Sequence, residues 1–169
     1  MFETNRTVVR QWQTSDLEVL VSVYGDTDAM RWVGDGKPIS RREAQHWLHV
    51  TVQNYRQRGY GMFAVELREN FAVIGFCGLV HPNGQPEPEL KYAYSRTYWG
   101  QGLASEVALG AIRYGAQVHG MKRIIATIAP ENTASHRVLL KSGMNKGELR
   151  QNGDGSQTQF FVWELHGET

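Results

Sequence analysis

The chain has 169 residues, a length typical of one domain, so we expect a single domain over residues 1–169. It is 41% hydrophobic and 21% charged, which is the composition of a globular protein. Its formal net charge of +1 argues against a nucleic-acid partner bound by broad phosphate neutralisation. We find no signal-peptide pattern and no apolar run long enough for a membrane span, so we expect a cytoplasmic protein without a membrane partner.

The chain begins with residues that predict a strand and a helix. Thr7–Trp12 has the pattern of a short strand. Ser15 and Glu18 then stand three residues apart, which is the spacing of a capping box. We therefore expect a helix that begins after Ser15 and runs toward Tyr24.

The same capping spacing recurs at Ser40 and Glu43. Apolar residues follow at helical periodicity until Gly59, which predicts a second, longer helix. The segment between the two helices is rich in turn residues and carries Trp32. We expect Trp32 to be exposed, where it could line a substrate cleft.

From Met62 the hydrophobic period changes from that of helices to that of strands. Two β-branched and aromatic runs, "MFAVEL" and "FAVIGFCGLV", flank a predicted hairpin turn at Arg68–Asn70. They contain Cys77, the only cysteine, so no disulfide can form within the chain. We expect Cys77 to be a small buried side chain in its strand. A loop that holds three of the five prolines then leads to a further strand, "LKYAYS".

The remainder of the chain alternates between helices and strands. Leu103–His119 is predicted to be a helix closed by Gly120, "RIIATI" a buried strand, and Thr133–Lys141 another helix. Two late strands follow near Met144–Arg150 and Gln157–Leu165. Because strands outnumber crossover helices, the sheet must be mixed. We therefore expect an α/β (α+β) fold, with a mixed, mostly antiparallel sheet of about seven strands flanked by about four helices.

A glycine-containing loop between a strand and the long helix is the clearest candidate binding site. Gly100 and Gly102 would let the backbone approach a ligand closely, and the helix N-terminus would add free N–H groups for a pyrophosphate. The glycines could also serve only a tight turn. A P-loop would need a lysine, which Ala104 and Ser105 do not supply. A dinucleotide fingerprint, with Glu131 as its acid, remains an alternative, although that fold usually opens with its fingerprint.

The same loop resembles the coenzyme loop of the GNAT superfamily of N-acetyltransferases, in its RimJ/RimL-like branch. The family pattern Gln/Arg-x-x-Gly-x-Gly/Ala corresponds to Trp99-x-x-Gly102-x-Ala104, where Trp99 departs from the general pattern. "APENTASHRVLLKSGM" is similar to the family's Asn-x-x-Ser/Ala helix that ends in Gly-Phe, with Met144 in place of the Phe. "MRWVGDGKPISRREAQHWL" is similar to the N-terminal helical region of the branch, so the resemblance covers nearly the whole chain.

The resemblance implies an acyltransferase that uses acetyl-CoA as cosubstrate and whose sheet is splayed. The strand before the loop would part from the next strand and leave main-chain groups for the pantetheine arm. Asn132 would contact that arm or N-cap the following helix, and both roles are compatible. The coenzyme-binding residues expected on this basis are Tyr94, Ser95, Arg96, Gly100, Gln101, Gly102, Leu103, Ala104, Ser105 and Asn132.

Acetyl transfer needs a neutral amine, a donor for the oxyanion and a proton for the departing thiolate. Many family members supply that proton from a helix tyrosine, but the matching residue here is Leu139. The resemblance offers Ser135 instead, with packing against the coenzyme as its alternative role. Glu89 is the carboxylate best placed to act as the base, or else a solvated strand end, whereas we expect Glu106 to be structural.

The expected acceptor is the α-amine of a protein N-terminus, as in ribosomal-protein acetylation, or a small-molecule amine. The enzyme would work as a monomer or a homodimer. The missing tyrosine also leaves open a non-catalytic module that binds or senses acyl-CoA. We expect no metal, because His46 and His49 lack a matching acidic motif and are better explained as solvated helix positions.

Overall fold

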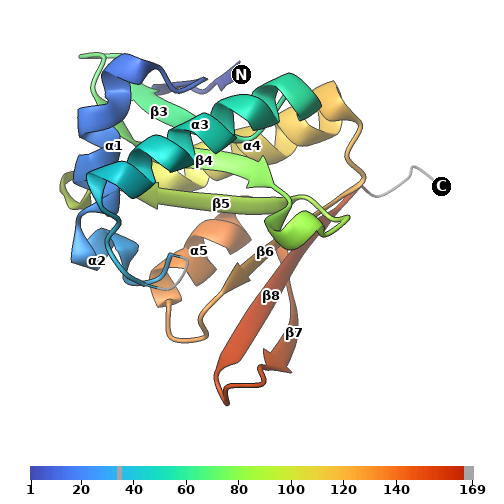
Figure 1. Cartoon of the computed structure of the whole chain (residues 1–169). Coiled ribbons are helices and arrows are strands. Elements are labelled where there is room, and N and C mark those ends of the chain that lie inside the picture. Colours follow the sequence, from blue (N-terminus) through green and yellow to red (C-terminus); the bar gives the residue numbers. More distant parts are fainter. Residues whose placement is uncertain (34–35, 166–169) are drawn as a thin grey trace.

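One eight-stranded sheet runs through the molecule in the order β1-β2-β3-β4-β5-β6-β8-β7 (Figure 1). The computed structural model describes residues 1–33 and 36–165, so residues 34–35 of the turn-rich segment lie outside the described residues. Neighbouring strands are antiparallel except β5 and β6, which are parallel, and this confirms the mixed, mostly antiparallel sheet. The strands are β1 (Phe2–Glu3), β2 (Thr7–Arg10), β3 (Met62–Leu67), β4 (Val73–Val80), β5 (Glu89–Tyr94), β6 (Arg123–Ile128), β7 (Asn145–Gln151) and β8 (Gln157–Glu164).

Helices cover both faces of the sheet (Figure 1). Side chains of β3 alternate between two apolar clusters, with Met62 and Ala64 in one and Phe63 and Val65 in the other. The first cluster lies under α1 and the start of α3, whereas the second lies under α4 and α5. The helices are α1 (Leu17–Tyr24), α2 (Thr27–Met30), α3 (Arg41–Arg58), α4 (Leu103–His119) and α5 (Thr133–Lys141).

The described chain contains eight strands and five α-helices, where the sequence predicted about seven and about four. The two added elements are β1 and α2. β1 is a two-residue strand that pairs with β2, and α2 is a single helical turn within the segment predicted to be turn-rich. Neither is long enough to show a hydrophobic period, which is why the pattern of the sequence did not predict them.

The cap of α1 differs from the expectation. The predicted capping box at Ser15 and Glu18 is wrong, because Gln13 and Asp16 form the box two residues earlier, at a single 3-10 turn (Thr14–Asp16) that leads into α1. The Asp16 carboxylate accepts a hydrogen bond from the Gln13 N–H at 2.8 Å, while Glu18 forms an exposed ion pair with Arg41. Asp16 takes the acidic position of the capping box because Arg10 of β2 also binds its carboxylate. A rule that considers only the spacing of residues along the helix cannot include that contact.

The other helix ends follow the sequence closely. The capping box of α3 is confirmed, since the Ser40 N–H donates to Glu43 at 2.6 Å and the Glu43 N–H donates to Ser40 at 3.3 Å. α3 ends at Gly59 and α4 at Gly120, both in left-handed conformations. Within the described residues, no helix is both long enough and apolar enough to cross a membrane.

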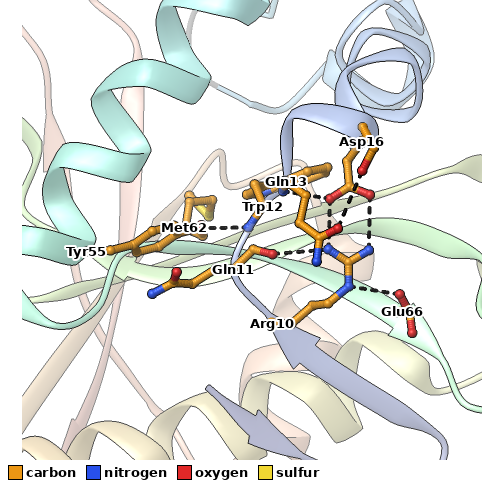
Figure 2. Close-up of polar contacts among 9 residues, drawn as sticks. Arg10, Gln11, Trp12, Gln13, Asp16, Tyr55, Met62 and Glu66 are labelled. Atoms are coloured by element: carbon orange, nitrogen blue, oxygen red, sulfur yellow. Dashed lines mark hydrogen bonds and ion pairs between the residues drawn. The ribbon is translucent and has the colours of Figure 1, made fainter.

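A network around Arg10 fixes the end of β2 to its neighbours (Figure 2). The guanidinium donates to both carboxylate oxygens of Asp16, at 2.8 and 3.0 Å, and to Glu66 of β3 at 2.8 Å. These three side chains are only 10–19% exposed. Burial alone would raise the pKa of Asp16, but the hydrogen bonds from Arg10 and the Gln13 N–H outweigh it and hold the pKa below its ordinary value.

The same region joins α3 to the sheet through a buried phenol (Figure 2). The Tyr55 hydroxyl donates to the carbonyl of Met62 at the start of β3 and accepts the N–H of Trp12 at 3.4 Å. The Tyr55 ring stacks on Phe63 with 5.3 Å between ring centroids. Together with the Arg10 network, this contact fixes the chain between β2 and α1.

We expect Asp16→Asn to lower the free energy of unfolding by about 2 kcal/mol at neutral pH, because it removes the charged acceptor of Arg10. A carboxyl whose folded pKa is depressed adds stability above its unfolded pKa, near 3.9, and loses it as the pH falls through the lower folded pKa. Urea denaturation should therefore show a larger gap between variant and parent at pH 7 than at pH 3.

Glu18→Gln provides the matched control, since it removes an exposed carboxylate from the same helix. We expect it to leave the free energy of unfolding unchanged at both pH values. Equal losses from the two variants would show that the Arg10 network contributes no more than a surface ion pair.

Candidate functional site

The parallel strands β5 and β6 part soon after they meet. Their one register pair in the described chain joins Glu89 to Ile125, at the start of β5. On its other side β5 is paired with β4 along its whole length, from Glu89 opposite Val80 to Tyr94 opposite Gly75. Beyond Glu89, β6 and its partners β8 and β7 turn away from β5, which leaves a split in the sheet (Figure 1).

The split exposes main-chain groups of β5. Hydrogen bonds in an antiparallel ladder alternate from one residue to the next. Since the Ser95 N–H donates to the Ile74 carbonyl at 2.8 Å, the residues at alternate positions before Ser95 also face β4. The N–H and carbonyl groups of Tyr92 and Tyr94 therefore point toward β6, across the split. The Tyr94 carbonyl there accepts the indole N–H of Trp99 at 2.8 Å.

A cavity of about 500 Å³ occupies this split. Both flanking strands, the N-terminus of α4, one face of α5 and the segment around Trp32 line it. Trp32 is 42% exposed, as expected, and lies among the lining residues. The lining includes eight of the predicted site residues: Tyr94, Gly100, Gly102, Leu103, Ala104, Ser105, Asn132 and Ser135.

The first turn of α4 presents free N–H groups to the cavity. Gly100 and Gly102 have φ angles of 75° and 77°, a left-handed conformation that favours glycine. The first hydrogen bond into the helix runs from the Glu106 N–H to the Gly102 carbonyl at 3.2 Å. The preceding N–H groups of the turn thus have no partner within the helix, and the helix dipole adds positive potential there. This arrangement suits an anion such as a pyrophosphate.

The first turn of α5 lies across the cavity from β5. The side chain of Asn132 caps the helix by accepting the Ser135 N–H at 3.1 Å, which confirms the capping role expected for it. Asn132 is also buried and lines the cavity, so the cap and a contact with a ligand are compatible. One turn further on, Leu139 is fully buried and forms part of the cavity wall.

Three residues that we expected to contact the coenzyme do not line the cavity and bind other parts of the protein instead. The Arg96 side chain binds Asp26 at 2.9 Å and Asp28 at 2.7 Å, at the N-terminus of α2. The Gln101 side chain donates to the Thr97 carbonyl at 3.1 Å. Ser95 uses its N–H to extend the β4 ladder. None of the three is among the cavity-lining residues.

Glu89 lies at the closed end of the split and outside the cavity lining. It is 3% exposed rather than a solvated strand end. Its carboxylate accepts hydrogen bonds from the hydroxyl of Thr127 and from Gln85 at 3.3 Å, and it pairs with Lys91 at 3.4 Å. The Glu89 carboxylate, which the sequence suggested as the base, therefore already interacts with three donors.

The cavity also contains residues that the sequence analysis did not select. Tyr92 lies two positions before Tyr94 on the same face of β5, and strand alternation could have identified it. Arg137 and Lys141 stand four residues apart on α5 and line the cavity, which the helical period could have shown. Trp99 departs from the family motif, yet its indole N–H binds the main chain of β5.

The polar contacts of Glu106 and of His49 lie outside the cavity lining. Glu106 accepts hydrogen bonds from Thr4 at 2.6 Å and from Arg6 at 2.8 Å, so the structural role expected for it is confirmed. The described residues include no group of three or more His, Cys, Asp or Glu side chains that could hold a metal ion. His49 contacts Gln53 on the exposed side of α3 at 3.0 Å.

Comparison with known proteins gives a consistent result. The family described as "Acetyltransferase (GNAT) domain" matches residues 6–145. An uncharacterized N-acetyltransferase of Bacillus subtilis (strain 168), YoaA, is 30% identical over 154 residues, which cover 89% of this chain and 86% of that protein.

Two solved structures share the fold over 96% of both chains. An acetyltransferase (GNAT family) from Bacillus anthracis superposes with a TM-score of 0.81 at 23% identity. RimL, a ribosomal L7/L12 alpha-N-protein acetyltransferase solved in complex with coenzyme A, superposes with a TM-score of 0.81 at 15% identity. The chain therefore belongs to the GNAT family of acetyltransferases and is an acetyl-CoA-dependent acyltransferase.

Proposed function

We propose that this enzyme transfers the acetyl group of acetyl-CoA to a primary amine, by direct attack of the amine on the thioester in a ternary complex. We place it in the RimJ/RimL-like branch, with a protein N-terminal α-amine as the favoured acceptor. The observation that carries the proposal is a single cavity that joins the free N–H groups of α4 to the unpaired edge of β5.

The coenzyme would bind in this cavity by its two chemically distinct parts. Its pyrophosphate matches the first turn of α4, where Gly100 and Gly102 allow close approach and the helix dipole favours negative charge. Its pantetheine arm carries amide groups that match the N–H and carbonyl groups of Tyr92 and the N–H of Tyr94 in the split. Arg137 and Lys141 add positive charge to the cavity lining, which favours an anionic ligand.

The same strand edge suits the chemistry of transfer. Attack of the amine on the thioester carbonyl develops negative charge on the carbonyl oxygen, and a main-chain N–H of β5 that faces the split can donate to it. The departing thiolate, with a pKa near 8.5 as a simple thiol, benefits from a nearby hydroxyl. Ser135 lines the cavity at the N-terminus of α5, and we propose it as one such donor.

The amine must lose a proton, and the demand on a base depends on the acceptor. An α-amine has a pKa of about 7.7–8.0, against about 10.4 for a lysine side chain, so a chain N-terminus is largely ready to react near neutral pH. Glu89 would have to release Thr127, Gln85 or Lys91 before it could accept this proton. An α-amine, which needs little help from a base, therefore fits this site better than a lysine side chain does.

The likeness to RimL also supports a protein N-terminus, because that enzyme is described as an alpha-N-protein acetyltransferase. A small-molecule amine of similarly low pKa is the alternative acceptor.

We expect the purified protein to release free CoA from acetyl-CoA when it is offered peptides with a free N-terminus. The peptide panel should include one blocked at its N-terminus but carrying a lysine, together with a set of small amines. A thiol-reactive chromogen would report CoA, and the rate should rise with pH up to about 8 as the α-amine loses its proton. Tight binding of acetyl-CoA without consumption in the presence of every amine would show a binding or sensing module instead.

We expect Gly102→Val to weaken acetyl-CoA binding about tenfold or more, because a β-branched residue does not readily hold the φ of 77° that aims the first N–H groups of α4 at the cavity. Isothermal titration calorimetry with acetyl-CoA measures this directly.

Gly120→Val is the matched control for backbone strain. Gly120 ends the same helix with a φ of 64°, and a Cβ there would meet no atom within 4 Å. Both variants should lose similar stability, but only Gly102→Val should lose affinity. Equal affinity in the two folded variants would remove the loop from the coenzyme site.

A further inference from the structure

The cavity contains a buried hydroxyl group that lacks a hydrogen-bond partner among the residues that the structure describes. Tyr92 lies in the middle of β5 and lines the cavity. Its hydroxyl oxygen is shielded from solvent and makes no hydrogen bond with any of the described residues. Buried polar groups are nearly always paired, so an unpaired one at a binding cavity indicates a place where a ligand supplies the partner.

The Tyr92 side chain lies on the face of the sheet that α4 and α5 cover, where it packs against the cluster that includes Leu139. Ser135 is its polar neighbour on α5. Burial raises the pKa of the Tyr92 hydroxyl, and the nearby Ser135 hydroxyl opposes part of that rise. The phenol therefore keeps its proton at neutral pH and has a second hydroxyl beside it, at the wall of the cavity.

Tyr92 also lies at a suitable depth along the strand. It stands two residues, or about 7 Å, from Tyr94, on the side away from the phosphate-binding loop. Its main-chain N–H faces the split, while its hydroxyl reaches toward α5. One residue thus offers two donors to a thioester that lies along the edge of β5, one from the main chain and one from the side chain.

We propose that Tyr92 donates a hydrogen bond and then a proton to the departing sulfur, and so replaces from a strand the helix tyrosine whose position Leu139 occupies. This inference rests on the proposed function, because it concerns the same cavity and the same reaction. It assigns the acid to a phenol, while Ser135 becomes the group that hydrogen-bonds Tyr92 and restores its proton.

The step balances as follows. The amine nitrogen forms a bond to the carbonyl carbon, and the carbon–sulfur bond breaks with its electron pair on sulfur. The sulfur takes the hydroxyl proton of Tyr92, and the phenolate regains a proton from water through Ser135. The proton lost by the amine returns to water, so the products are an amide and a free thiol.

The test is Tyr92→Phe, which removes the hydroxyl and keeps the ring. We expect kcat to fall about 10²-fold or more, within the range for general acids, while calorimetry shows an acetyl-CoA Kd within about threefold of the parent. Tyr114→Phe is the control, because Tyr114 is a buried tyrosine of the same apolar cluster whose hydroxyl makes only a 3.4 Å contact with the Gly59 carbonyl. It lies outside the cavity lining and should leave kcat unchanged.

Ser135→Ala separates the two hydroxyl groups. Alone it should lower kcat about tenfold, and the double variant Tyr92→Phe/Ser135→Ala should be no slower than Tyr92→Phe, because the two groups act on one proton. Losses that multiply in the double variant would overturn the relay.

The remaining outcomes distinguish this inference from the proposed function. A parent protein that binds acetyl-CoA but turns over no amine would overturn the proposed function itself. A parent that turns over while Tyr92→Phe keeps full kcat would overturn only the role of Tyr92. A fall in acetyl-CoA affinity as large as the fall in kcat/KM would make Tyr92 a binding residue and likewise overturn its role as an acid.

Discussion

The separation of β5 from β6 is the constraint on which the rest of the site depends. β5 is held along its whole length by β4 but has one register pair with β6, so one of its edges lacks a strand partner. Backbone N–H and carbonyl groups that are buried need hydrogen-bond partners. A ligand with amide groups along its length supplies them, and the split is therefore both a gap in the sheet and a template for the coenzyme arm.

The loop that begins α4 is held in place from outside the cavity. Arg96 binds Asp26 and Asp28 of the α2 segment, while Arg6 binds Glu106 and donates to the Gln101 carbonyl at 3.0 Å. Of these charged residues only Asp28 lines the cavity, so the two arginines position the loop without occupying it. The first-turn N–H groups stay available, and a site that is already ordered loses less entropy when a ligand binds.

The α5 side of the cavity combines a capped helix start with an apolar wall. Asn132 fixes the first turn by its hydrogen bond to the Ser135 N–H, which also fixes the position of the Ser135 hydroxyl. Leu139 closes the wall one turn later and has no group that could donate a proton. The strand edge and the start of the helix each supply a hydroxyl to the cavity, from Tyr92 and Ser135.

Local sequence patterns determined much of this protein. The bounds of α4 and α5 follow from their apolar period and terminal glycines, the capping box of α3 from Ser40 and Glu43, and the loop with positive φ from Gly100 and Gly102. Each depends on residues within one or two turns of each other, and such interactions can be read along a chain. The placement of Asn132 as a cap was predictable for the same reason.

Only the tertiary structure decided which of these residues share the cavity. Arg96 turned to α2 because two carboxylates about 70 residues earlier bind it, and Asp16 rather than Glu18 became the acidic residue of the capping box because Arg10 reaches it from β2. Glu89 became buried because Thr127 of β6 lies beside it. Tyr92 became a candidate for the general acid only in the folded structure, because α5 places Ser135 beside its unpaired hydroxyl. Side-chain pairing across distant segments depends on how the strands and helices pack, and the local hydrophobic pattern carries no record of it.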